Sequence, residues 1–208
     1  MIAAAVAGAA LGSKLLFWLE DPSLTAQNLR NPAYLIGGKT IVSALVFGLI
    51  TVELIKRYIG LRQSTGDLYA IPLALGIAIG RIGCFLTGLA DNTYGTPTTL
   101  PWAVNFGDGI PRHPTQLYEI TFLLALVPIL YKILALTPSH RFLPGDTFKF
   151  FMVAYLSFRL LCDFIKPYPR IFLGLGGIQW ACLLTLLYYS RDILRWVRSA
   201  PASATSQG

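Results

Sequence analysis

An arginine lies deep inside a long apolar run, and this feature restricts the possible folds more than any other in the sequence. The run extends from Leu68 to Ala90, and Arg81 is its fourteenth residue. At about 1.5 Å of rise per helical residue, Arg81 would lie roughly 20 Å from the start of the run, inside hydrocarbon if the run spans a bilayer. A charge there costs about 2.5–3.5 kcal/mol on insertion scales, so it normally faces a polar cavity and a partner. The rest of the chain is expected to build that cavity.

The composition indicates an integral membrane protein. Of the 208 residues, 54% are hydrophobic and only 13% are charged, which is far more apolar than soluble chains usually are. The net charge of +7 does not indicate nucleic-acid binding, because the basic residues gather at the ends of apolar runs. Basic residues in those places are better explained as topology and interface anchors.

The predicted fold is an all-α, polytopic membrane helix bundle in a single domain, residues 1–199. We expect about six spans, at residues 2–19, 35–55, 68–90, 117–136, 147–165 and 171–189. Residues 20–34 contain two prolines and are predicted to form a loop. Residues 91–116 are too polar to cross hydrocarbon but contain aromatic side chains, which predicts a small cap on the membrane surface. Residues 200–208 are predicted to be a disordered tail.

Glycines in two of the predicted spans indicate helix packing faces. Gly8 and Gly12 have the small-xxx-small spacing that lets two membrane helices approach closely. Gly76, Gly80 and Gly83 would leave one face of the third span bare, so that another backbone could approach near Arg81.

The positive-inside rule predicts the orientation of these spans. An even number of spans puts both termini on one side, together with seven basic residues: Lys56, Arg57, Arg62, Arg141, Arg191, Arg195 and Arg198. The other side would hold four: Arg30, Arg112, Lys166 and Arg170. The first side is therefore predicted to be cytoplasmic and the cap to face outward.

No metal site and no cofactor site is expected. Cys84, Cys162 and Cys182 are widely spaced within apolar runs, so they are interpreted as small buried hydrophobic residues. The sequence also contains no glycine-rich phosphate loop and no nucleophile elbow.

Arg81 has two interpretations. It could fix helix packing against carbonyls or a carboxylate, or it could bind an anion in an intramembrane cavity, which is the interpretation we favour. A guanidinium suits a phosphodiester, so the expected ligand is a phospholipid headgroup. Arg159 and Asp163 are four residues apart, on one helical face, and are either a neutralised structural pair or part of the same site.

The segment from His113 to Glu119 places a histidine and a carboxylate at the entrance of the fourth span. Its structural interpretation is a capped helix with Tyr118 in the aromatic belt and Glu119 shallow enough to be hydrated. With Arg81 in the same region, Gln116 and Glu119 also become candidates for holding the arginine or a substrate glycerol. His140 would lie on the cytoplasmic side, so His113 is the candidate base on the active side.

Five strings in order resemble the prolipoprotein diacylglyceryl transferases: GRIGCF, LPWAVNF, RHPTQLYE, YLSFRLLCDF and GLGGIQ. The resemblance covers nearly the whole chain, and RHPTQLYE is its most specific string. It implies a polytopic enzyme of the bacterial inner membrane. Such an enzyme moves the diacylglyceryl group of phosphatidylglycerol to the lipobox cysteine thiol of a preprolipoprotein and releases glycerol phosphate.

The resemblance also implies site residues. It makes Arg81 and Arg159 catalytic, with His113 as a candidate base. The residues that it implies for substrate binding are Arg81, Gly95, Gln116, Tyr118, Glu119 and Asp163.

The chain departs from the family pattern at several positions. Cys84 stands where the family has asparagine, and Thr87 stands where a second asparagine is usual. The family's His-Gly-Gly-Leu string falls on Val42-Ser43-Ala44-Leu45, so that histidine is absent there. The resemblance also places the first residue at the family's second span, which leaves open whether an upstream helix precedes it.

The main hypothesis is therefore a diacylglyceryl transferase whose expected partners are phosphatidylglycerol and a lipobox peptide. A transferase with another acceptor and a catalytically silent relative that binds phospholipid or lipoprotein are the alternatives. A small lipid or anion transporter is less favoured, because the two halves show no internal repeat. The sequence specifies neither the acceptor nor the oligomeric state.

Overall fold

The computed structural model describes residues 1–20, 22–37, 40–61, 63–137, 142–170 and 172–199. Helices dominate these residues, and one two-stranded antiparallel sheet joins β1 to β2. The long helices are α1 (Ile2–Glu20), α4 (Ile41–Tyr58), α5 (Asp67–Thr87), α6 (Thr115–Leu136), α7 (Asp146–Cys162) and α8 (Gly177–Tyr188). The short elements are α2 (Pro22–Gln27), α3 (Pro32–Ile36), η1 (Gly88–Asp91), β1 (Val104–Asn105), β2 (Pro111–Arg112), η2 (Asp163–Ile165) and α9 (Ser190–Ser199).

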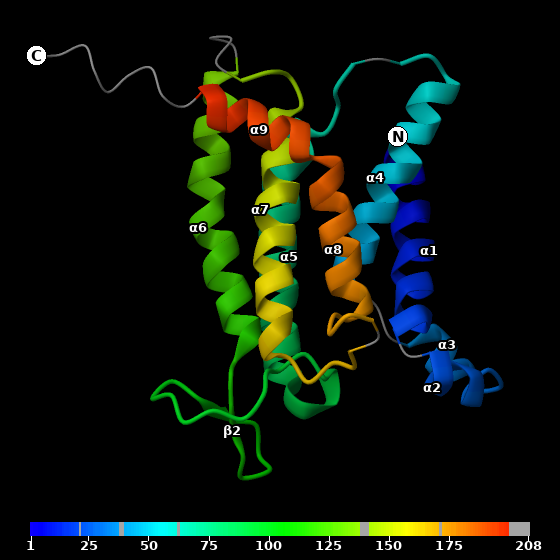
Figure 1. Cartoon of the computed structure of the whole chain (residues 1–208), viewed down its shortest axis with the longest axis vertical. Coiled ribbons are helices and arrows are strands. Elements are labelled where there is room, and N and C mark those ends of the chain that lie inside the picture. The colour runs from blue at the N-terminus through cyan, green and yellow to red at the C-terminus, as the bar shows by residue number, and fades with distance from the viewer. Residues whose placement is uncertain (21, 38–39, 62, 138–141, 171, 200–208) are drawn as a thin grey trace, which may run out of the picture.

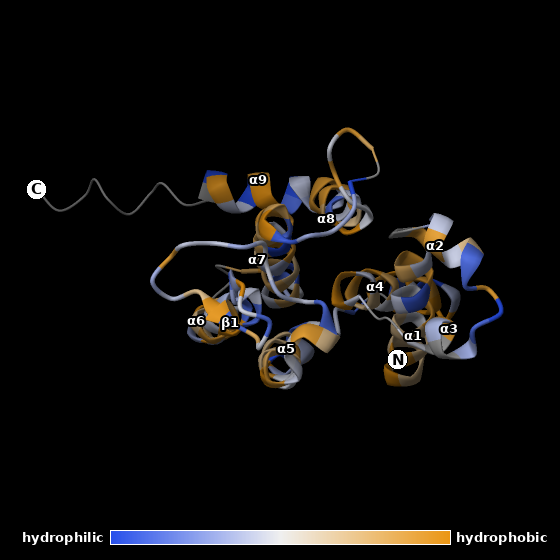
Figure 2. Ribbon diagram, turned by 90° about the horizontal axis from the view of Figure 1, so that it is seen from below, coloured by the Kyte–Doolittle hydropathy of each residue, from blue (hydrophilic) through white to orange (hydrophobic). Residues whose placement is uncertain are grey.

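The long helices run roughly side by side in two groups (Figure 1). Helices α5, α6, α7 and α8 form the main bundle, and its core contains Ala74, Leu123, Phe151 and Tyr155. Helices α1 and α4 form a separate pair, which lies apart from α5 to α7 when seen along the bundle (Figure 2). The prediction of an all-α membrane bundle is confirmed.

Three of these helices are long and apolar enough to cross a membrane: residues 2–19, 67–91, in which η1 continues α5, and 115–136. Helix α8 is apolar but shorter. Helices α4 and α7 occupy most of the second and fifth predicted spans. The count of six spans stays a prediction.

The predicted loop at residues 20–34 is wrong, because two short helices form there. Pro22 and Pro32 are the first residues of α2 and α3. Proline is tolerated at that position because its missing N–H has no partner in the helix anyway, and its fixed φ suits the helical conformation.

Two predicted spans begin later than expected. Helix α4 begins at Ile41 rather than Leu35, after Thr40 in an extended conformation. Helix α8 begins at Gly177 rather than Ile171, because Leu173 and Gly174 take positive φ values of 51° and 72°. A left-handed turn at these residues cannot continue a right-handed helix.

The packing face at Gly8 and Gly12 is confirmed. A Cβ at Gly8 would meet Thr51 and would lie 2.8 Å from the carbonyl oxygen of Phe47, and a Cβ at Gly12 would meet the Phe47 side chain. Both neighbours belong to α4, so the two glycines let α1 and α4 pack closely. The interpretation of Gly76, Gly80 and Gly83 is wrong, because nothing lies within 4 Å of a Cβ at any of them.

We expect Gly12→Leu to destabilise the protein by about 1–3 kcal/mol, because the new side chain would collide with Phe47. Thermal unfolding in detergent measures the change. Gly76→Leu is the matched control, since the space around Gly76 is open and the change there should be small. Equal effects of the two substitutions would contradict the close packing of α1 on α4.

The two ends of the bundle carry different elements (Figure 1). The N-terminus, the end of α4 and α9 lie at one end, and α9 runs across it. Asp146 at the start of α7 holds α9 in place, because Arg195 Nη2 and Trp196 Nε1 donate to its carboxylate over 2.6 and 3.2 Å. The β1–β2 hairpin, α2 and α3 lie at the opposite end. Both ends of the chain's described part therefore lie on the same side.

Candidate functional site

Glu119 is the centre of a buried cluster of charges at the hairpin end of the bundle. Its Oε2 atom lies 2.9 Å from Arg81 Nε and 3.2 Å from Arg159 Nη1. Its Oε1 atom accepts a hydrogen bond of 2.6 Å from the hydroxyl of Tyr155. Arg159 Nη2 also donates to Asp163 Oδ1 over 2.9 Å. The carboxylate of Glu119 on α6 thus contacts side chains of two other helices, α5 and α7.

The helical periodicity of each element directs these side chains into the bundle. On α5 the buried positions include Ala70, Ala74, Ala78 and Arg81, which recur every three or four residues. On α6, Glu119 continues the buried stripe of Leu123, Leu126 and Leu130. On α7, Tyr155 and Arg159 are one helical turn apart, and Asp163 in η2 follows after another. Such spacing puts each set on one helix face.

The cluster is almost completely removed from solvent. Arg81 is 5% exposed, Arg159 and Asp163 are 3% exposed, and Glu119 is fully buried. The expectation of a hydrated Glu119 in a structural helix cap is therefore wrong. The packing of α5 and α7 against α6 makes Glu119 the counter-ion of Arg81 and a second counter-ion of Arg159, which also pairs with Asp163.

Several polar atoms of the cluster have no hydrogen-bond partner among the described residues. Arg159 Nε is one of them, and Asp163 Oδ2 is another. Arg81 Nε lies close to Glu119, but it is not aligned for a hydrogen bond. Gln116 is 1% exposed, and neither its amide nitrogen nor its oxygen is paired. Buried polar groups are normally satisfied, so these atoms are available to bind a ligand or an ordered water.

His113 and Tyr118 form a second, separate group with Trp102. Trp102 Nε1 donates to the Tyr118 hydroxyl over 2.8 Å, and that hydroxyl lies 3.1 Å from His113 Nδ1. No hydrogen bond or ion pair within the described ranges joins this group to Glu119. The residues predicted for one site are therefore divided between a buried charge cluster and a half-exposed cap group.

Gly95 holds the cap against the bundle. Its N–H donates to the carbonyl of His113 over 2.9 Å, and the next residue, Thr96, donates to the carbonyl of Ile165 over 2.8 Å. A Cβ at Gly95 would lie 2.6 Å from His113 Cβ and 2.9 Å from the Ile165 carbonyl oxygen. Only glycine fits this close approach without a shift of neighbouring atoms.

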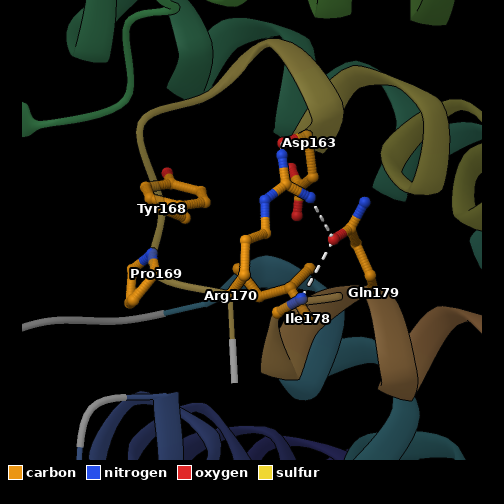
Figure 3. A pocket seen from close by; sticks show the side chains of 7 residues that line it. Asp163, Tyr168, Pro169, Arg170, Ile178 and Gln179 are labelled. Carbon is orange, nitrogen blue, oxygen red and sulfur yellow. Dashed lines mark hydrogen bonds between the residues drawn. The ribbon is translucent and has the colours of Figure 1, made fainter. Parts of the chain in front are cut away.

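A small pocket opens beside the cluster, between the end of η2 and the start of α8 (Figure 3). The guanidinium of Arg170 lies near Asp163 and donates to Gln179 Oε1 over 2.7 Å. The same oxygen accepts a hydrogen bond of 3.0 Å from the Gly176 N–H. The pocket is lined by Asp163, Tyr168, Pro169, Arg170, Gly176, Ile178 and Gln179.

A much larger, mostly apolar cavity of about 700 Å³ separates the α1–α4 pair from α5, α7 and α8. Ile77, one helical turn before Arg81, lines it. Polar residues at its other end include Glu53, Lys56 and Lys149. The cavity thus begins one turn from the charge cluster and runs toward the α9 end.

Sequence reasoning missed four residues of this region: Tyr155, Trp102, Lys166 and Arg170. Tyr155 is the one that periodicity could have revealed, because it precedes Arg159 by one helical turn. In the sequence, Lys166 and Arg170 are recognisable only as charges that bear on membrane topology. His140 lies outside the described residues. Within the described part of the chain, no group of three or more potential metal-ligating side chains comes together.

These features define a class: an all-helical membrane protein with a buried arginine–carboxylate cluster next to an apolar cavity. A family model described as prolipoprotein diacylglyceryl transferase matches residues 1–197. The chain belongs to this family.

Relatives support the assignment. A phosphatidylglycerol–prolipoprotein diacylglyceryl transferase of Bordetella parapertussis is 35% identical over 194 residues, which is 88% of this chain and 71% of the relative. The protein of the same name from Bordetella bronchiseptica is 35% identical over 197 residues, with the same coverage. The Bordetella avium protein of that name is 33% identical over 174 residues, 81% of this chain and 63% of the relative. No solved structure matches the chain.

Proposed function

We propose that this chain transfers the diacylglyceryl group of phosphatidylglycerol to the cysteine thiol of a prolipoprotein. The observation that carries this proposal is the buried pair of arginines, Arg81 and Arg159. Each has an Nε–H that makes no hydrogen bond among the described residues, and Arg81 lies one helical turn from Ile77 of the apolar cavity. Family membership and the names of the relatives support the same reaction.

The geometry suits a phospholipid, because one end of the substrate is charged and the other is apolar. The phosphate would lie against Arg81 and Arg159, and the acyl chains would extend into the cavity beside Ile77. The unpaired amide of buried Gln116 is suited to the hydroxyls of the headgroup glycerol. Glu119 and Asp163 orient the two guanidinium groups rather than binding the substrate directly.

In the reaction, the acceptor sulfur attacks the diacylglyceryl carbon that carries the phosphate ester oxygen. A C–S bond forms, the C–O bond breaks, and its electron pair stays on the departing glycerol phosphate. Two fixed guanidinium groups stabilise that developing charge in a site without water, which is the main electrostatic contribution we assign to the protein. The thiol proton must pass to a base.

His113 is the candidate base, and the structure restricts how it can act. Its Nδ1 atom is engaged with the Tyr118 hydroxyl, which already accepts from Trp102. His113 accepts a proton at Nε2 only if Nδ1–H donates to Tyr118. The direction of the Tyr118–His113 hydrogen bond therefore sets the tautomer of His113 and thereby whether Nε2 can act as the base.

The orientation in the membrane follows from charge. The basic residues of α4 and α9 lie at the end that holds both ends of the described part of the chain: Lys56, Arg57, Arg191, Arg195 and Arg198. We propose that this end is cytoplasmic and that the β1–β2 cap faces outward in the bacterial inner membrane. Arg62 and Arg141, two further residues of the cytoplasmic set, lie outside the described residues.

A transfer assay tests the proposal. The purified chain is mixed with phosphatidylglycerol, labelled in its acyl chains, and a synthetic lipobox peptide. We expect label on the peptide, and none on a peptide in which alanine replaces the cysteine. A serine or amine acceptor tested in parallel identifies a changed acceptor. Lipid binding without label on any acceptor would favour the alternative, a catalytically silent relative that binds phospholipid. Two departures from the family pattern also favour that alternative: Cys84 and the Val42-Ser43-Ala44-Leu45 string.

A further inference from the structure

Lys166 is a buried lysine at the outer end of the bundle. It follows directly after η2 and is only 2% exposed. Its backbone N–H donates to the carbonyl of Asp163, and the preceding carbonyl, of Ile165, accepts from Thr96 in the cap. The cap and α7 thus fix Lys166 beside the charge cluster.

The Lys166 ammonium has no carboxylate partner among the residues that the structure describes. Within the described part of the chain it lies over the face of the Tyr168 ring, with 5.5 Å between Nζ and the ring centroid. A buried charge is normally paired, because removing an ammonium from water is costly. The other lysines and arginines of the interior do have such partners: Arg81 and Arg159 contact Glu119, and Lys56 contacts Glu53.

The charges that act on Lys166 come from three helices and η2. They are Arg159 and Asp163 from α7 and η2, Glu119 from α6, and Arg81 from α5. Three cations therefore face two carboxylates, which leaves one positive charge uncompensated. Arg170 is not part of this count, because it is exposed to solvent and its guanidinium donates to Gln179 and to backbone carbonyls.

We infer that Lys166 supplies the uncompensated positive charge of the headgroup site and thereby selects a lipid with a single net negative charge. This inference rests on the proposed function. A phosphodiester with an uncharged glycerol headgroup would make the buried cluster neutral. A zwitterionic headgroup brings its own cation along with its phosphate, so the single excess positive charge stays uncompensated and the site rejects such a lipid.

The ionisation of Lys166 makes the selection dependent on pH. Burial is the largest influence and lowers the pKa of Lys166 from 10.5 to about 8, with the nearby Arg159 acting in the same direction. Below about pH 8 the ammonium is charged and the cluster attracts the anionic headgroup. As the pH rises through the pKa, the charge is lost and the attraction weakens.

Binding of short-chain lipids to the detergent-solubilised chain tests the inference by calorimetry. The probes are phosphatidylglycerol, phosphatidylethanolamine with the same acyl chains, and free glycerol phosphate. We expect the wild type to prefer phosphatidylglycerol, and to lose affinity by up to about tenfold for each pH unit above the pKa. Binding of glycerol phosphate alone would show that the phosphate suffices, whereas its failure to bind would show that the diacylglyceryl part is required. In either case, the charge role of Lys166 requires that the affinity for phosphatidylglycerol falls as the pH rises.

Two variants separate the charge of Lys166 from its other properties. Lys166→Gln should weaken phosphatidylglycerol binding at neutral pH by roughly 10- to 100-fold and remove both the preference and the pH dependence. Lys166→Arg should keep the preference and lose the pH dependence, because guanidinium stays charged. Lys166→Gln should not unfold the protein, because it removes a buried charge that has no carboxylate partner among the described residues. If a variant did misfold, the pH dependence of binding by the wild type would still test the inference.

The inference would be overturned if the Lys166→Gln variant kept the lipid preference and the pH dependence of the wild type. A wild-type affinity that is constant from about pH 6.5 to about pH 9.5 would also overturn it, since that window brackets the pKa. These outcomes are distinct from failure of the proposed function. A chain that selects phosphatidylglycerol through Lys166 but labels no acceptor would retain this inference and lose the transferase.

Discussion

Glu119→Gln should destabilise the protein by about 3–5 kcal/mol. Glutamine has nearly the same shape as glutamate, so the packing is kept while Arg81 and Arg159 lose their shared counter-ion. Breaking a buried ion pair from one side leaves an uncompensated charge, which is far more costly than losing an exposed pair. The loss should appear as a lower midpoint of thermal or denaturant unfolding in detergent.

Glu53→Gln is the matched control for this prediction. Glu53 pairs with Lys56 over 3.0 Å, but its side chain is 42% exposed, so its removal should cost no more than about 1 kcal/mol. If the two glutamine variants unfold alike, then the cluster around Glu119 does not contribute to stability as its burial implies.

Arg81→Ala should reduce transfer to the lipobox peptide by about 10²–10³-fold or more. The substitution removes a fixed donor group from the place where negative charge develops on the departing phosphate. The same variant should bind phosphatidylglycerol more weakly, and lipid binding is measured separately so that binding and chemistry can be distinguished. Arg81→Lys should recover part of the binding but little of the transfer, because an ammonium lacks the fork that matches a phosphate.

Arg112→Ala is the control for the arginine prediction. Arg112 lies in the cap, where it pairs with Asp108 and stacks on Tyr94 at 5.0 Å from the ring centroid, away from the buried cluster. The Arg112→Ala substitution should leave the rate of transfer close to that of the wild type. An Arg81→Ala protein that folds, binds lipid and transfers like the wild type would make Arg81 a structural partner of Glu119 only.

The amino-acid sequence by itself determined the class of fold and half of the buried cluster. Apolar runs predicted the helices because a chain this apolar must satisfy its backbone hydrogen bonds within each segment. The pair of Arg159 with Asp163 followed from the helical repeat, as did the close approach of α1 at Gly8 and Gly12. Each of these depends on local spacing, which the sequence displays directly.

The tertiary structure alone decided which charges meet. Glu119 lies 38 positions after Arg81 and 40 before Arg159, and no local rule states that one carboxylate will serve both. Local rules likewise do not predict that the space around Gly80 is open, or that Lys166 is buried without a carboxylate partner among the described residues. Periodicity fixes which face of its own helix a side chain occupies. Only the packing of several helices fixes which side chains of other helices that face contacts. Because the dielectric constant of the interior is low, the contacts between charged groups there have large effects on stability and binding.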